Sequence, residues 1–225
     1  MLVAGAALIA APFAAAIPTV YYDIGAAGTD FSVFDNEALK DMQPLAGAIS
    51  SSFTSGGFTA LTTAATKPAL GSPTVPSLAN SQLQLSGTGT ITFYFAESGF
   101  GPSSTRFLAE LAVISLAPTA TVSYFTYATM GALESSPGVL ILGLGAPMTT
   151  QVLGGLGANQ ANGVLPFAGT GPYNLIQKVV INQPTGGSTQ ISANLTSSVP
   201  DGGTTLALLG ASLLGMGAVR RKLTK

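Results

Sequence analysis

The sequence contains no histidine, no cysteine and no tryptophan. Without histidine and cysteine, the chain cannot build a zinc or haem site from those ligands, and it has neither a thiol nucleophile nor a Ser-His-Asp arrangement. Disulfide bonds are excluded for the same reason. Any chemistry would therefore depend on carboxylates, hydroxyls and a few amines, and we expect no bound cofactor.

Charge is also scarce, since lysine and arginine number 8 and aspartate and glutamate 9 among 225 residues. Charged residues make up 8% of the chain, against about a quarter in ordinary soluble domains. Binding to duplex nucleic acid needs clustered basic residues, so a nucleic-acid partner is excluded. Disorder is excluded too, because 47% of the residues are hydrophobic and the net charge is only −1.

The N-terminal segment has the pattern of an export signal. Residues 2–16 form an apolar, alanine-rich run, and Ala14 and Ala16 supply the small side chains that a signal peptidase reads. We therefore predict a signal peptide over residues 1–16 containing a hydrophobic helix. No basic residue precedes the run, which leaves open a start upstream of Met1. The alternative is a buried helix, which Pro12 would interrupt.

The C-terminal segment has the pattern of a membrane span. Residues 204–219 carry no charge and end abruptly at Arg220, Arg221 and Lys222. Sixteen helical residues rise by roughly 24 Å, slightly less than the bilayer core. By the positive-inside rule, the basic cluster would stop transfer and stay in the cytoplasm. We predict a transmembrane helix over 204–219; the alternative is a C-terminal core helix.

A short motif, an apolar helix and a basic end, in that order, resemble the PEP-CTERM class of C-terminal sorting signals, in the variant that begins Val-Pro-Asp-Ser-Gly. The motif residues are Val199, Pro200, Asp201, Gly202 and Gly203. The Pro-Glu-Pro triplet of the class is replaced by Pro-Asp-Gly. The resemblance implies an exported bacterial protein and processing by an exosortase, a membrane-embedded enzyme of bacteria that make extracellular polysaccharide. The sorting signal would occupy residues 199–225.

The intervening residues, 17–198, are long enough for one domain with a sizeable core. Several segments alternate between apolar and polar residues with period two, as strands do. They include residues 82–86 and 90–95, separated by a glycine-rich turn, and residues 190–196, which we expect to pair as a hairpin with 178–182. We also expect 121–126 to pair with 106–116, a segment whose pattern equally suits a helix. Short strands with such turns predict an all-β domain, an antiparallel β-sandwich or jelly roll.

Carboxylates are the candidate reactive groups. Glycoside hydrolysis needs two of them roughly 5–10 Å apart, and Glu97, Glu110 and Glu134 are available. Five acids also gather near the N-terminus, at Asp23, Asp30, Asp35, Glu37 and Asp41. Oxygen ligands on one loop suit Ca²⁺, but their spacing does not match an EF-hand, and turn or cap roles explain them equally. We therefore predict neither a metal site nor catalytic residues.

We interpret the chain as an exported cell-surface or extracellular-matrix protein with a structural or adhesive role and no enzymatic activity. It would be a membrane-anchored precursor before processing, and exopolysaccharide is a possible partner. The alternative is a secreted carbohydrate-binding module, in which exposed rings stack on sugars; a carboxylate-based glycoside hydrolase is a third reading. The candidate rings are Tyr21, Tyr22, Tyr94, Tyr124, Tyr127 and Tyr173. A row of exposed rings would favour the binding module, and buried rings would favour the scaffold.

Overall fold

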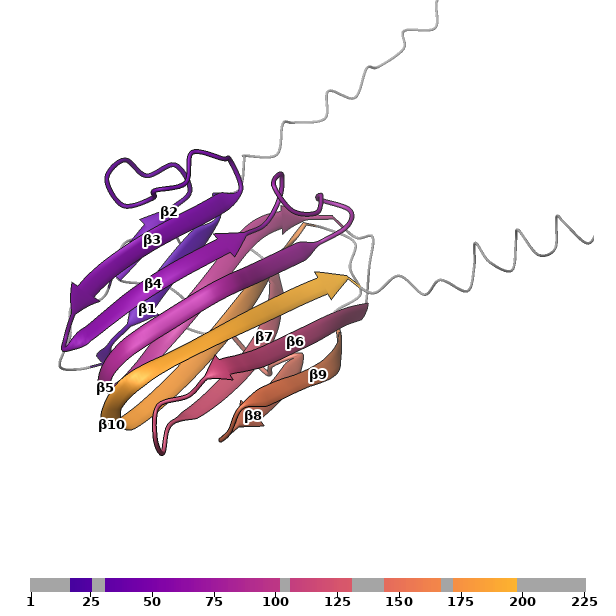
Figure 1. Cartoon of the computed structure of the whole chain (residues 1–225). Coiled ribbons are helices and arrows are strands. Elements are labelled where there is room, and N and C mark those ends of the chain that lie inside the picture. The colour runs from indigo at the N-terminus through magenta and orange to yellow at the C-terminus, as the bar shows by residue number, and fades with distance from the viewer. Residues whose placement is uncertain (1–16, 26–30, 102–105, 131–143, 167–171, 198–225) are drawn as a thin grey trace, which may run out of the picture.

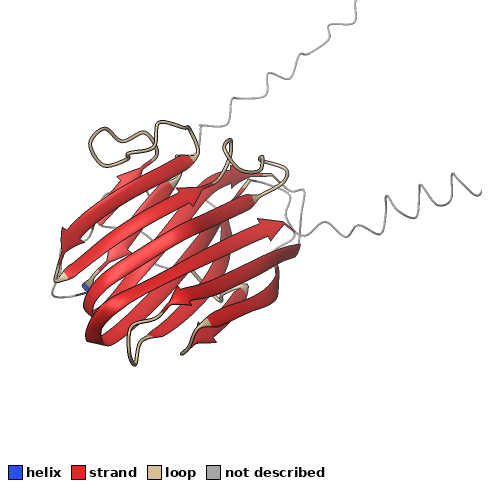
Figure 2. Cartoon of the chain, viewed as in Figure 1, coloured by secondary structure: helices blue, strands red, loops and turns tan. Residues whose placement is uncertain are grey.

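The computed structural model describes residues 17–25, 31–101, 106–130, 144–166 and 172–197. In these ranges the regular structure consists of antiparallel β-strands (Figure 2). The ten strands are β1 (Thr19–Asp23), β2 (Phe31–Phe34), β3 (Ala48–Ser55), β4 (Phe58–Ala65), β5 (Ser77–Phe100), β6 (Arg106–Ser115), β7 (Thr121–Met130), β8 (Thr149–Leu153), β9 (Gly157–Val164) and β10 (Tyr173–Ser197).

The two longest strands, β5 and β10, join the strands into two layers (Figure 1). The first half of β5 pairs with β4 and with the second half of β10, and β3 and β6 extend this layer on either side, with β9 beyond β6. We call it layer one. The second half of β5 pairs with β1 and with the first half of β10, and β2, β7 and β8 complete layer two. The result is an antiparallel β-sandwich.

Each long strand changes layer at a glycine-containing bend. In β5 the bend lies at Gly87, whose φ is +148° and whose position leaves no room for a side chain. A Cβ atom there would approach the carbonyl oxygen of Gly57 to 2.6 Å. In β10 the register shifts between Gln183 and Gly187, where residues 184–186 lie opposite the single residue Thr88 and turn the corner. Glycine at both corners therefore allows one strand to serve two layers.

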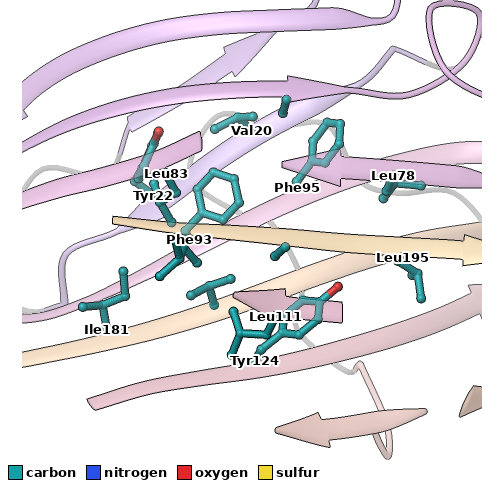
Figure 3. Packing of buried hydrophobic residues seen from close by; sticks show 14 of the residues in the cluster. Val20, Tyr22, Leu78, Leu83, Phe93, Phe95, Leu111, Tyr124, Ile181 and Leu195 are labelled. Carbon is teal, nitrogen blue, oxygen red and sulfur yellow. The ribbon is translucent and has the colours of Figure 1, made fainter. Parts of the chain in front are cut away.

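The core lies between the layers and is built from alternate residues of the strands. Tyr22, Phe93 and Phe95 of layer two face Leu78 and Leu83 of layer one (Figure 3). All five side chains are at most 1% exposed. Aromatic rings pack together at one end of this core. The centre of the Tyr22 ring lies 4.4 Å from that of Phe53 and 5.3 Å from that of Phe93.

The predicted all-β antiparallel fold is confirmed, whereas three predicted local pairings are wrong. Residues 82–86 and 90–95 are not two strands around a turn but parts of the single strand β5, which bends from one layer to the other. Residues 178–182 and 190–196 do not pair with each other, because both pair with β5. Strand β6 pairs with β9 and β10, while β7 pairs with β8 and β10.

The predicted hydrophobic helices at 1–16 and 204–219 lie outside the described residues, as do the motif at 199–203 and the basic cluster at 220–222. Within the described ranges, no helix is long and apolar enough to cross a membrane.

Candidate functional sites

A buried ion pair joins the end of β4 to β5. Glu97 has the same parity as Phe93 and Phe95, so it points inward and its side chain is 1% exposed. Lys67, two residues beyond β4, places its Nζ 2.6 Å from Glu97 Oε1 and 2.6 Å from the carbonyl oxygen of Ser98. The hydroxyl of Thr66 contacts the second carboxylate oxygen. The lysine ammonium also lies 4.2 Å from the centre of the Phe100 ring, a cation–π contact.

Opposing effects act on the Glu97 carboxyl. Burial raises the pKa of Glu97 above its ordinary value, and the negative charge of Asp35 acts in the same direction. Hydrogen bonds from Lys67 and Thr66, together with the lysine charge, lower it. The pair therefore compensates two charges that the sandwich would otherwise bury at a large cost.

The residues around the ion pair connect two loops of the sandwich. Gly47 accepts a hydrogen bond from the Thr66 amide at 2.7 Å and donates its own amide to Asp35 at 2.8 Å. A Cβ at Gly47 would lie 2.5 Å from the carbonyl oxygen of Lys67, so only glycine fits. These contacts tie the loop after β2 to the loop after β4.

The carboxylates proposed for glycoside hydrolysis do not share a cleft. Glu97 is enclosed in layer two, whereas Glu110 lies on the outer side of β6 in layer one and accepts a hydrogen bond from Gln160 at 2.6 Å. The third candidate, Glu134, lies outside the described residues. The described part of the chain therefore contains no pair of these glutamates facing one substrate.

The acids near the N-terminus cap backbone amides. Asp23 accepts from Gly25, and Asp41 accepts from Asn36, Gln43 and Ser50. Glu37 accepts from the Phe34 amide and pairs with Lys40 at 2.7 Å, whereas Asp30 lies outside the described residues. No group of three or more potential ligand residues gathers in the described ranges. Local capping engages most of the carboxylate oxygens that a calcium ion would need, although Asp35 Oδ1 is buried without a hydrogen-bond partner.

The six tyrosines are all buried, with at most 9% of each exposed. Tyr22, Tyr124 and Tyr173 belong to the core between the layers. Tyr21, Tyr94 and Tyr127 form a second apolar cluster with Ala96 and Ile176, against which Leu144 packs. Burial raises the pKa of Tyr94 to about 12, with smaller contributions from the charge of Asp23 and from Tyr127. The described strands therefore present no row of exposed tyrosine rings for stacking on sugars.

Across four of its strands, the outer side of layer one is an uncharged surface whose side chains are mostly polar. Its side chains alternate with buried core residues along four adjacent strands, β3, β4, the first half of β5 and the second half of β10. None of these segments contains a charged residue. We call this surface the polar face, and it comprises Ser50, Ser52, Thr54, Thr59, Thr63, Gln82, Gln84, Ser86, Ser188, Gln190, Ser192, Asn194 and Thr196.

Sequence reasoning anticipated neither the polar face nor the ion pair. The serine, threonine and glutamine content was visible, but its concentration on one side of four strands follows from pairings between distant segments. For Glu97 a signal did exist, because the alternation through Phe93 and Phe95 places it on the inward side.

Comparisons with solved structures find distant similarity to several domains. TmCBM61, solved with beta-1,4-galactotriose, is 8% identical at a TM-score of 0.32, covering 60% of this chain and 87% of that one. The adhesin domain of Epf from Streptococcus pyogenes is 11% identical at a TM-score of 0.37, and the match covers 80% of this chain and 56% of that one. The K1 cleaved adhesin domain of Lys-gingipain from Porphyromonas gingivalis W83 is 10% identical at a TM-score of 0.37, and the match covers 80% of this chain and 98% of that one. At these TM-scores, the similarities assign no activity to this chain.

The C-terminal segment matches a described sorting motif. Among curated proteins, none matches the chain. Residues 198–223, however, match the VPDSG-CTERM motif, and this span includes the motif, the apolar run and the basic cluster singled out above. The chain therefore carries a PEP-CTERM-like exosortase sorting signal at its C-terminus, which marks it as an exported protein.

Proposed function

We propose that the chain is a cell-surface or extracellular-matrix protein with a structural or adhesive role, released to its final location by an exosortase. The observation that carries this proposal is the sorting signal at residues 198–223. Residues 1–16 would direct export, and residues 204–219 would hold the precursor in the membrane. The motif at 199–203 would then lie at the outer side of the membrane, where the exosortase can reach it. The β-sandwich is then the part that remains at the surface.

The basic cluster would fix the orientation of the precursor. Moving a lysine or arginine to the centre of a bilayer costs about 2.5–3.5 kcal/mol per residue on insertion scales. Arg220, Arg221 and Lys222 would therefore stay on the cytoplasmic side. Pro200 cannot continue a strand ladder, and Gly202 and Gly203 keep the motif accessible in an extended form.

The chemistry of the described residues supports a structural or adhesive role rather than catalysis. The chain lacks histidine and cysteine, and Glu97 is engaged by Lys67 in a buried pair. A secreted carbohydrate-binding module is the second candidate, and the uncharged polar face is the observation that favours it.

Deletion of the exosortase gene in a host that carries one tests the proposed function. In the parent strain we expect the protein in the surface fraction, and in the deletion strain we expect it in the membrane fraction. Neutralising Arg220, Arg221 and Lys222 with glutamine should disturb this distribution, whereas Lys225→Gln, a basic residue outside the cluster, should not. An identical distribution in the parent and deletion strains would contradict the role of the exosortase.

A further inference from the structure

We propose that the polar face binds a neutral polysaccharide, an inference that rests on the proposed surface function and names the partner of the sandwich. The occupant is an uncharged glycan chain lying across β4, β5 and β10 of layer one. The site is a surface of hydroxyls and carboxamides, and it needs neither a metal ion nor exposed aromatic rings.

The arrangement of the side chains supports an extended ligand. Thr59 of β4, Ser86 of β5 and Ser188 of β10 lie directly opposite one another and form a row of hydroxyls across three strands. In the next row Gln84 lies between Gln190 and the apolar Leu61. Opposed side chains in antiparallel strands are separated by about 4.5–5.5 Å at Cβ. The neighbouring row pairs Thr63 with Gln82. Amides and hydroxyls are thus repeated at short intervals over the surface, as the hydroxyls are along a polysaccharide.

The amides of this surface have unused hydrogen-bonding capacity. The side chains of Gln82, Gln84, Gln190 and Asn194 make no hydrogen bond to another described residue. Inside the sandwich, by contrast, Gln177 donates to the carbonyl oxygen of Leu78 and to the Tyr124 hydroxyl, both at 3.0 Å. A carboxamide offers two donors and an acceptor, and each sugar hydroxyl both donates and accepts.

The absence of charge selects a neutral glycan. The four strand segments that form the polar face hold no charged residue, and neither does β9 at the edge of layer one. Among the strand segments of layer one, only β6 carries charged residues, Arg106 and Glu110. An anionic polysaccharide would need a cluster of cations, whereas here the single Arg106 is balanced by Glu110. A neutral glycan meets no such penalty.

Affinity electrophoresis of the full-length chain in neutral detergent tests this proposal. The gels contain dextran, hydroxyethylcellulose or mannan as neutral polymers, and alginate as the anionic comparison. We expect retardation by at least one neutral polymer and none by alginate. In the double variant Gln84→Ala/Gln190→Ala, the apparent affinity should fall about fivefold or more.

The control is Thr121→Ala/Asn182→Ala, which removes a directly opposed polar pair from the outer side of layer two, together with the hydrogen bond that Thr90 donates to Asn182 at 3.2 Å. It should bind as the unmodified chain does, and thermal unfolding should show that both double variants remain folded. Failure of all three neutral polymers to retard the chain, equal retardation of the Gln84/Gln190 variant, or preference for alginate would each overturn the proposal. None of these results bears on exosortase processing, so the proposed function would stand or fall separately.

Discussion

Glu97 and Lys67 show how a chain with few charges uses one buried pair. Both residues leave water, so each depends on the other for compensation. Because burial raises the pKa of Glu97, the folded protein binds this proton more tightly than the unfolded chain does. The resulting contribution to the free energy of unfolding is fully present below the unfolded pKa of about 4.3 and is lost as pH rises through the folded pKa.

We therefore predict that Lys67→Met lowers the free energy of unfolding by about 3–5 kcal/mol at pH 7, because it leaves a buried carboxylate unpaired. The loss should shrink at pH 5, where Glu97 is more readily protonated. Urea unfolding at both pH values measures this difference. The double variant Lys67→Met/Glu97→Gln has no charge at the site, so its loss of unfolding free energy should be the same at both pH values. An equal loss at both pH values in the single variant would refute the coupling.

The side of the strand on which a residue lies was predictable from the sequence, but the residue with which it pairs was not. The inward position of Glu97 follows from the alternation of β5. Its pairing with Lys67, thirty residues earlier in the sequence, depends on the course of the loop that follows β4 and had no local signal.

Among the elements, β6 illustrates how pairing decides an ambiguous pattern. Its sequence suits a helix or a strand, yet pairing with β9 and β10 makes it a strand with Phe107, Ala109, Leu111 and Val113 buried. The predicted hairpins failed for a related reason, because alternation identifies a strand without identifying its neighbour. The glycines near residue 87 mark a change of layer rather than a reversal of the chain.

A pair of leucine substitutions tests the orientation of β6. Leu111 is 1% exposed and Leu108 is half-buried on the other side. We predict that Leu111→Ala costs about 2–5 kcal/mol and Leu108→Ala about 1 kcal/mol or less, as measured by urea unfolding. In a helix these residues, three apart, would share one face. Similar losses for both would therefore contradict the strand.

The loops around Asp23 and Asp35–Gly47 should not bind calcium with measurable effect. Their carboxylates already accept hydrogen bonds from backbone amides. We expect millimolar Ca²⁺ to leave the melting temperature unchanged relative to a sample in EDTA. A ligand that binds the folded state raises this temperature by mass action, so a rise that EDTA reverses would show that capping is not the only role of these acids.

At the scale of the whole molecule, the mean hydropathy of +0.49 reflects the two apolar terminal segments together with a sandwich of few charges. We predict that residues 17–198 alone are soluble without detergent, because hydroxyls and amides make up most of the outward side chains on β3, β4 and the layer-one halves of β5 and β10. The full-length chain should partition into membranes. Sedimentation with and without detergent distinguishes the two, and a trimmed chain that still needs detergent would contradict the assignment.

Sequence and structure contribute differently to the account of the whole chain. The sorting signal was recognisable from the order of its parts, because each part is local: a short motif, an apolar run and a basic end. The two-layer path of β5 and β10 and the polar face that it creates depend on contacts between distant segments, so only the structure reveals them.

The most direct test of export and processing is the intact mass of the protein extracted from the surface of an exosortase-containing host. The account predicts a mature chain that lacks residues 1–16 and everything after the motif at residues 199–203. Such a mass would locate both ends in one measurement. Recovery of a chain that still extends through Lys225 would contradict the account and reduce the C-terminal segment to a simple membrane anchor.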